Sequence, residues 1–168
     1  MSKYDIVVGI DPDVEKSGYV VVESASGKVI TATNWDLAKL YGVLAADKEY
    51  CKTKGLKMLV VVEAAYLGSH HNWHLNSNGK ISKAVAANIG YRTGLNHETG
   101  RAIVEFCRYL EVDVIPQKPF KKCWKVPDKK ITHEEITQLT KWDKKKSNQE
   151  IRDALLLAWM HTTQPMIL

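Results

Sequence analysis

The chain has 168 residues, of which 45% are apolar and 26% are charged, and its formal net charge is +5. This length and composition are typical of one globular domain with a hydrophobic core, and we expect residues 1–168 to form one domain. The apolar stretches are far shorter than the roughly 20 residues that span a bilayer, so the sequence predicts no membrane segment.

The N-terminus and the cysteines favour a reducing compartment. Residues 1–5 lead straight into an apolar run, so we expect no secretory signal. Cys51, Cys107 and Cys123 are odd in number and lack a CxxC pairing, which favours free thiols over a disulfide framework or a zinc site. We therefore expect a cytoplasmic protein.

The first half of the chain predicts strands followed by a helix and another strand. Apolar runs indicate strands at about 4–11, 17–24 and 27–34, and Ser26-Gly27 supplies the turn between the last two. Leucines at helical spacing predict a helix over about 36–53, which Gly55 ends. A fourth strand, at about 57–63, should run parallel to the first.

The second half is mainly helical. After a polar loop at about 67–80, helical patterns cover about 81–110, with a break expected near Gly94 to Thr99. A fifth strand is predicted at about 112–115 and helices at about 132–141 and 148–162, the former starting with the capping-box pair Thr132 and Glu135. The order predicts an α/β fold with a mixed five-stranded sheet and helices on both faces.

Four carboxylates stand where these elements end or begin. Asp11 and Glu63 end two fully apolar strands, and Glu150 and Asp153 lie three residues apart at the start of the last helix. Helical geometry places both of these acids beside Ala154 and Leu157, which should pack on the sheet. Converging carboxylates repel one another unless a divalent cation lies among them, and Mg²⁺ prefers such oxygen ligands. The sequence therefore predicts a metal-dependent phosphoryl-transfer site.

The positive charge is concentrated beside this acidic helix. Residues 116–146 hold ten lysines against four acids, a local charge of +6, whereas the rest of the chain carries −1. A basic segment next to carboxylates is typical of nucleases, since lysines hold phosphates. A solvated lysine-rich face is the alternative.

The ordered set of motifs resembles the RuvC-type Holliday junction resolvases of the RNase H-like superfamily. It comprises Gly9-Ile10-Asp11-Pro12 with the return at Ser17-Gly18, then Val61-Val62-Glu63 on a strand, a polar loop and long helix, and Asp153-Ala154 in the last helix. The resemblance covers nearly the whole chain and implies an RNase H-like fold.

The resemblance also implies a two-metal mechanism. Two Mg²⁺ ions, or Mn²⁺ in their place, lie about 3.5–4 Å apart in such sites, one activating water and one stabilising the leaving oxygen. Asp11 would be the shared ligand, Glu63 the second strand ligand, and Glu150 and Asp153 the helix ligands.

Each acid also has a structural interpretation. Ser147 and Glu150 fit a capping box, Asp153 lies where the helix dipole favours an acid, and Asp11 and Glu63 could be ordinary strand-end residues. Asp13 stands where the family commonly has glycine, and whether it also contacts metal stays open.

The resemblance implies further contacts with DNA. His70, His71 and Trp73 lie in the loop that reaches toward the junction centre in that family, where Trp73 could stack on an unpaired base. A surface loop without a special role is equally compatible, and the loop lacks the cysteine or HExxH pattern of a zinc site. Basic residues expected at phosphates are Arg92, Lys118, Lys121, Lys122 and Lys125.

These observations favour an endonuclease that nicks four-way DNA junctions in pairs, acting as a homodimer. Another RNase H-like nuclease, acting on RNA, hybrids, flaps or other branched DNA, would carry the same acids. A junction-binding dimer without catalysis is a further alternative. It would allow neutral residues in the acidic set, whereas all four positions here are carboxylates. An actin-like or sugar-kinase-like ATPase needs a duplicated domain, which 168 residues cannot supply.

Overall fold

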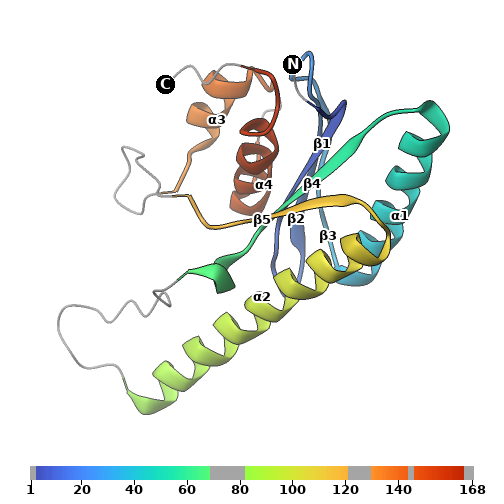
Figure 1. Cartoon of the computed structure of the whole chain (residues 1–168). Coiled ribbons are helices and arrows are strands. Elements are labelled where there is room, and N and C mark those ends of the chain that lie inside the picture. The colour runs from blue at the N-terminus through green and yellow to red at the C-terminus, as the bar shows by residue number, and fades with distance from the viewer. Residues whose placement is uncertain (1–2, 69–81, 121–129, 144–145, 165–168) are drawn as a thin grey trace.

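The computed structural model of the chain describes residues 3–68, 82–120, 130–143 and 146–164. Its elements are, in order, β1 (Ile6–Asp11), β2 (Ser17–Glu23), β3 (Val29–Trp35), α1 (Leu37–Lys54), β4 (Met58–Glu63), the 3₁₀ turn η1 (Ala65–Leu67), α2 (Lys83–Tyr109), β5 (Asp113–Gln117), α3 (His133–Thr140) and α4 (Gln149–Trp159) (Figure 1). The predicted element types are confirmed, and most boundaries differ by one or two residues.

The five strands form one mixed sheet in the order β3-β2-β1-β4-β5. The first three strands are antiparallel neighbours, and β4 and β5 continue the sheet parallel to β1. Both β1 and β4 are buried along their whole length except for their last residue. Such continuous apolar strands arise because helices cover both faces of the sheet.

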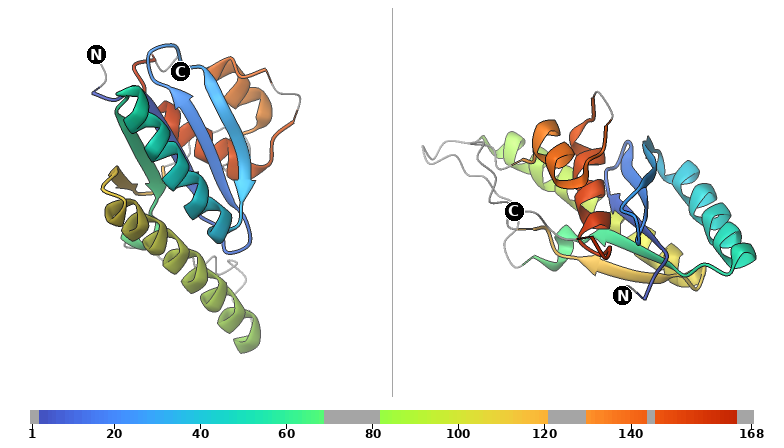
Figure 2. Two further views of the ribbon diagram at one scale, coloured as in Figure 1. Left: turned by 90° about the vertical axis from the view of Figure 1, so that its right-hand side faces the viewer. Right: turned by 90° about the horizontal axis from the view of Figure 1, so that it is seen from above.

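Each face of the sheet has its own hydrophobic core. On one face Val8, Ile10 and Val60 pack with side chains of α1 and α2, such as Leu40 and Ile103. On the other face α3 and α4 cover the alternate strand positions. Figures 1 and 2 show α1 and α2 on one side of the sheet and α3 and α4 on the other. The predicted mixed sheet with helices on both faces is confirmed.

The predicted break near Gly94 to Thr99 is wrong, because α2 is one continuous helix of 27 residues. Glycine in a helix costs only about 1 kcal/mol relative to alanine, and the burial of Ile103, Val104 and Cys107 against the sheet supports the second half of the helix. The Thr99 hydroxyl also donates to the Leu95 carbonyl inside the helix, at 2.9 Å. Tertiary packing therefore overrides the local glycine signal.

Turns and caps place the helices as the sequence indicates. Asp36 caps the start of α1 and accepts from the Lys39 amide, and Gly55 ends it in the left-handed conformation at φ 67°. The expected capping box of Thr132 and Glu135 is present at the start of α3. No helix in the described ranges is long and apolar enough to cross a membrane.

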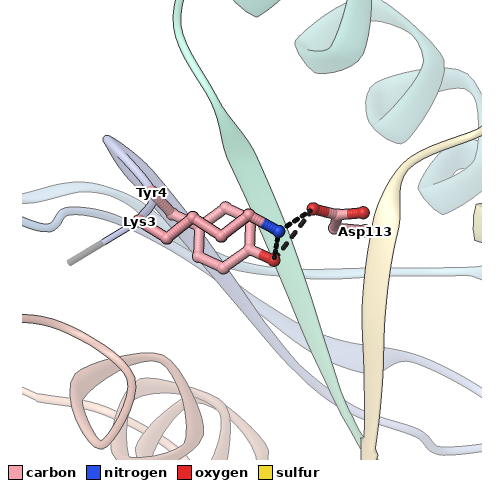
Figure 3. A network of polar contacts seen from close by, with 3 residues as sticks. All are labelled: Lys3, Tyr4 and Asp113. Carbon is pink, nitrogen blue, oxygen red and sulfur yellow. Dashed lines mark hydrogen bonds and ion pairs between the residues drawn. The ribbon is translucent and has the colours of Figure 1, made fainter.

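The N-terminal segment contacts β5, an edge strand of the sheet. The Tyr4 hydroxyl donates to the Asp113 carboxylate of β5 at 2.8 Å, and Lys3 lies 3.5 Å from the same oxygen (Figure 3). These contacts lower the pKa of Asp113, chiefly through the Tyr4 hydrogen bond. Because the charged partners Lys3 and Asp113 are both exposed, their ion pair adds little to stability.

Candidate active site

Asp11 and Glu63 lie at the same edge of the sheet. The parallel strands β1 and β4 pair Ile10 with Val62, so the acids that follow these residues leave neighbouring strands at one level. Both acids are partly exposed, although every residue before them in the two strands is buried. The carboxyl ends of parallel strands thus bring together two acids that are 52 positions apart, as the sequence predicts.

Two glycines allow α4 to lie directly on the sheet. A Cβ atom on Gly18 would lie 2.1 Å from the carbonyl oxygen of Glu150, and one on Gly9 would lie 1.9 Å from that of Ala154. Any larger residue at either position would displace the helix backbone. Gly18 is also the register partner of Asp11, so the same contact brings the start of α4 to the acidic strand end.

Three of the four predicted metal-ligand acids line one hollow of about 250 Å³, called here the carboxylate hollow. Asp11 comes from β1, Glu63 from β4 and Glu150 from α4. The other lining residues are Pro12, Asp13, Ala65, Thr93, Asn96 and His97. The structure therefore brings three of the four predicted acids to one space, each from a different element.

The structure removes the capping interpretation of Glu150. Asn148 is the N-cap of α4, and its side chain accepts from the Ile151 amide at 3.0 Å. The Ser147 hydroxyl lies instead 2.9 Å from Nδ1 of His133. Glu150 is thus a first-turn residue that lines the carboxylate hollow.

Asp153 occupies a different environment from the other three acids. Only 7% of it is exposed, and its carboxylate accepts a 2.8 Å hydrogen bond from the Gln149 amide one turn earlier. It does not line the carboxylate hollow. Asp153 is thus a buried carboxylate on the sheet-facing side of α4, beside the fully buried Ala154.

The donor chemistry of the carboxylate hollow fits Mg²⁺, which prefers carboxylate and water oxygens. Yet within residues 3–68, 82–120, 130–143 and 146–164 no three Asp, Glu, His or Cys side chains stand close enough to form a ready-made metal site. Like charges at this spacing repel one another, so a divalent cation would favour closer approach of Asp11, Glu63 and Glu150. The hollow thus supplies suitable ligands in a more open arrangement than a metal-bound site needs.

The loop between β1 and β2 is held by Asp13. Its carboxylate accepts from the amides of Glu15, at 2.8 Å, and Lys16, at 3.3 Å. Its backbone amide bonds to the Ser17 hydroxyl at 3.1 Å. Asp13 therefore has a clear structural task in shaping this turn, and it also lines the carboxylate hollow.

Helix α2 forms a wall of the hollow that the sequence analysis did not identify. Thr93, Asn96 and His97, spaced to share one helix face, line the same hollow as the acids. Asn96 also accepts from the Val14 amide at 3.2 Å, which ties the β1–β2 loop to the helix. In a continuous helix, the spacing of these polar residues predicts that they share a face. The predicted break at Gly94 to Thr99 placed them in different elements, so this face was not recognised.

A second hollow, of about 620 Å³, adjoins the first and is called here the polar hollow. The two share Asp13, Asn96 and Glu150. The polar hollow also contains the two cations Lys16 and Arg92, and its remaining lining residues are Val14, Glu15, Thr33, Asn34 and Asn148. The amide of Asn148 donates to Asn34 at 2.7 Å. Arg92, one of the predicted phosphate contacts, therefore lies next to the acids.

The remaining predicted contacts are only partly described. Lys118 is exposed and directly follows β5, whose last residue Gln117 pairs with Glu63, so it lies at the acidic edge of the sheet. The other residues predicted to contact DNA lie outside the described ranges: His70, His71, Trp73, Lys121, Lys122 and Lys125.

The fold matches two solved structures of RuvC from Thermus thermophilus. The RuvC in complex with a Holliday junction substrate is 15% identical, with a TM-score of 0.52, and the match covers 93% of this chain and 91% of that chain. A second structure of the same RuvC is 16% identical, with a TM-score of 0.52 and coverage of 93% and 92%. Comparison of the sequence with protein-family models and with curated proteins finds no match. The likeness confirms the predicted RuvC-type, RNase H-like fold.

Proposed function

We propose that this protein is a metal-dependent endonuclease that resolves four-way DNA junctions by paired nicks. The observation that carries the proposal is the convergence of Asp11, Glu63 and Glu150 on one hollow at the carboxyl edge of the sheet. The fold is that of a RuvC whose structure contains a Holliday junction substrate. Fold alone does not define chemistry, and the three acids supply the chemical argument.

In this proposal the carboxylates hold two Mg²⁺ ions, which Mn²⁺ can replace. Bound in this site, the metals would lower the pKa of attacking water and stabilise the leaving oxygen. Asp11 lies between Glu63 on β4 and Glu150 above Gly18, which suits the shared ligand. The fourth proposed ligand is Asp153, which lies on the sheet-facing side of α4. The buried strands and the glycine contacts fix the backbone positions of these acids before substrate binds.

DNA binding is assigned to the basic residues around this edge. Arg92 in the polar hollow and Lys118 after β5 flank the carboxylates on two sides, where they can hold phosphates beside the cleaved bond. Lys121, Lys122 and Lys125 belong to the segment that carries the positive excess of the chain, and at least one of them is proposed to stabilise transition-state charge. His70, His71 and Trp73 are proposed to contact the junction centre.

Paired nicking requires two active sites, and we propose a homodimer. The first half of α2 carries exposed apolar side chains, Val85 at 51% and Tyr91 at 66% exposed. This part of the helix extends beyond the sheet (Figure 1). A second copy packed along this part of the helix would cover these side chains. It would also place one carboxylate hollow at each of two DNA strands of the junction.

The experiment is a cleavage assay on a labelled synthetic four-way junction, beside duplex, flap and RNA–DNA hybrid substrates, with Mg²⁺ or Mn²⁺. Asp11→Asn removes one charge from the site, and Glu49→Gln removes one from the exposed surface of α1 as the matched control. Paired symmetric nicks on the junction, lost only in Asp11→Asn, are expected. Cleavage of the hybrid or the flap instead would contradict the proposed junction substrate, whereas the proposed metal site would stand. Tight binding of the junction without cleavage in Mg²⁺ or Mn²⁺ would contradict the proposed nuclease activity.

A further inference from the structure

The side chains that α2 contributes to the carboxylate hollow differ in chemical type from the acids that the other elements contribute. Asp11, Asp13, Glu63 and Glu150 bring only carboxylates, whereas Thr93, Asn96 and His97 bring a hydroxyl, an amide and an imidazole. All three are partly buried at residues of one helix face. A phosphodiester held against the acids would therefore also lie beside hydrogen-bonding groups of α2.

This wall is rigidly placed relative to the acids. A Cβ on Gly100, one turn after His97, would lie 3.5 Å from the Glu63 carbonyl oxygen and 3.5 Å from the Pro12 ring. Helix α2 therefore packs closely against the ends of β4 and β1. Asn96 adds the 3.2 Å bond from the Val14 amide. His97 therefore belongs to a part of α2 that packs beside the strand ends carrying Asp11 and Glu63.

Phosphate-ester cleavage gathers negative charge on the non-bridging oxygens in the transition state. Protein hydrogen-bond donors beside the carboxylates can share in stabilising this charge. A donor that is already in place when charge develops gives the largest benefit, because it needs no reorganisation. Of the three side chains on the wall, the imidazole has the longest reach, and the Asn96 side chain is held by the bond that its carbonyl accepts from the Val14 amide.

We propose that His97 is a further catalytic residue, whose ring N–H donates a hydrogen bond to a non-bridging oxygen of the scissile phosphate. The inference rests on the proposed nuclease function and adds to it a group outside the carboxylate set. It assigns Asn96 a positioning task, since Asn96 holds the loop that follows Asp11. It also gives α2 a direct part in the reaction.

The first test uses shape-matched variants in single-turnover cleavage of a four-way junction at saturating enzyme. Loss of one preorganised donor costs about 10²–10³-fold in rate, so His97→Ala and His97→Phe should both cleave roughly 10²-fold more slowly. His97→Gln keeps an N–H donor and should recover part of the rate. The affinity for the junction in Ca²⁺, without cleavage, should stay unchanged in all three variants.

A phosphorothioate at the scissile position supplies a readout that a purely structural role would not move. Sulfur in place of the contacted oxygen should slow the wild-type enzyme for one of the two isomers. His97→Phe should lose this additional slowing, because the contact is already absent. In protein labelled with ¹⁵N-histidine, the ring resonance of His97 should shift when junction is added in Ca²⁺.

The outcomes separate this inference from the proposed function. Wild-type rates in His97→Phe and an unmoved His97 resonance, with cleavage still abolished by Asp11→Asn, would overturn the role of His97 and leave the nuclease intact. Failure of the wild-type chain to cleave any branched substrate would overturn the proposed function, and the catalytic role of His97 with it.

Discussion

Gly18 lies directly beneath the backbone of Glu150, so close that a Cβ atom on Gly18 would come within 2.5 Å of the Glu150 carbonyl carbon. Because Gly18 pairs with Asp11 in the sheet, this single close approach sets the distance between the strand acids and the helix acid. The relationship between the two residues couples the packing of α4 to the geometry of the carboxylate hollow.

Gly18→Ala should therefore impair the site and the fold together. Overpacking of this kind costs about 1–3 kcal/mol, and the added methyl group should push the start of α4 away from β2. We expect a lower free energy of unfolding, measured by urea denaturation, and a loss of junction cleavage greater than the fraction unfolded explains.

Gly42→Ala is the matched control, because a Cβ atom at this position in α1 would have nothing within 4 Å of it. Alanine in a helix interior is more stable than glycine by about 0.5–1 kcal/mol, so this variant should gain stability and keep its activity. Full activity in Gly18→Ala would contradict the positioning of Glu150 through Gly18.

Asp153→Asn tests the fourth acid without removing its acceptor. The asparagine carbonyl can still accept from Gln149, so the fold should be retained, whereas the negative charge is lost. Loss of a group that supports metal ligands typically costs 10–100-fold in metal affinity, and we expect at least about that loss in Mn²⁺ binding by calorimetry. Unchanged Mn²⁺ affinity would show that Asp153 serves the helix alone, and Gln149→Ala measures what the hydrogen bond contributes.

Tyr19→Phe removes a buried hydroxyl that connects β2 with α1. The Tyr19 hydroxyl donates to the Asp47 carboxylate, and burial, together with this carboxylate, raises the pKa of Tyr19 far above its ordinary value of 10. A partly buried acceptor left without its donor costs about 1–3 kcal/mol. Denaturant titration should show this loss, and Tyr109→Phe, at an 81% exposed position, should show almost none.

The buried thiols should make the protein less stable in alkali. Burial raises the pKa of Cys107 from 9.0 to about 12, and burial, followed by Asp47 and Asp5, raises that of Cys51. Between these pH values the unfolded chain releases a thiol proton that the folded chain keeps, so the free energy of unfolding falls as pH rises above about 9. Unfolding measured from pH 8 to 10 should show a shallower decline in Cys107→Ala than in the wild type. An equal slope would contradict this contribution.

How far the sequence predicts this molecule depends on the kind of signal. Asp11 and Glu63 could be placed because each ends a fully apolar strand, and parallel pairing then brings strand ends together. Glu150 and Asp153 could be placed on the sheet-facing side of the last helix by their spacing from Ala154. That Asp153 is buried whereas Glu150 lines the hollow could not be predicted, because both environments depend on the contact of α4 with Gly9 and Gly18.

The contribution of α2 was not predictable from local rules. Gly94 is a helix-weakening residue, and the sequence around it suggested a break where the structure has Asn96 and His97 lining the carboxylate hollow. What keeps the helix continuous is the burial of later residues such as Ile103 and Cys107 against the sheet. A local propensity of about 1 kcal/mol is small beside such burial, which contributes about 1.5–3 kcal/mol for each large apolar side chain.

The most direct test of the central claim is the product formed from a supercoiled plasmid that extrudes a cruciform, incubated with the protein and Mg²⁺. A junction resolvase that nicks in pairs within one binding event yields linear plasmid without accumulating nicked circles, and Asp11→Asn yields neither product. Intact supercoiled plasmid after incubation with wild-type protein in Mg²⁺ and in Mn²⁺, or an equal rate of nicking in Asp11→Asn, would contradict the account.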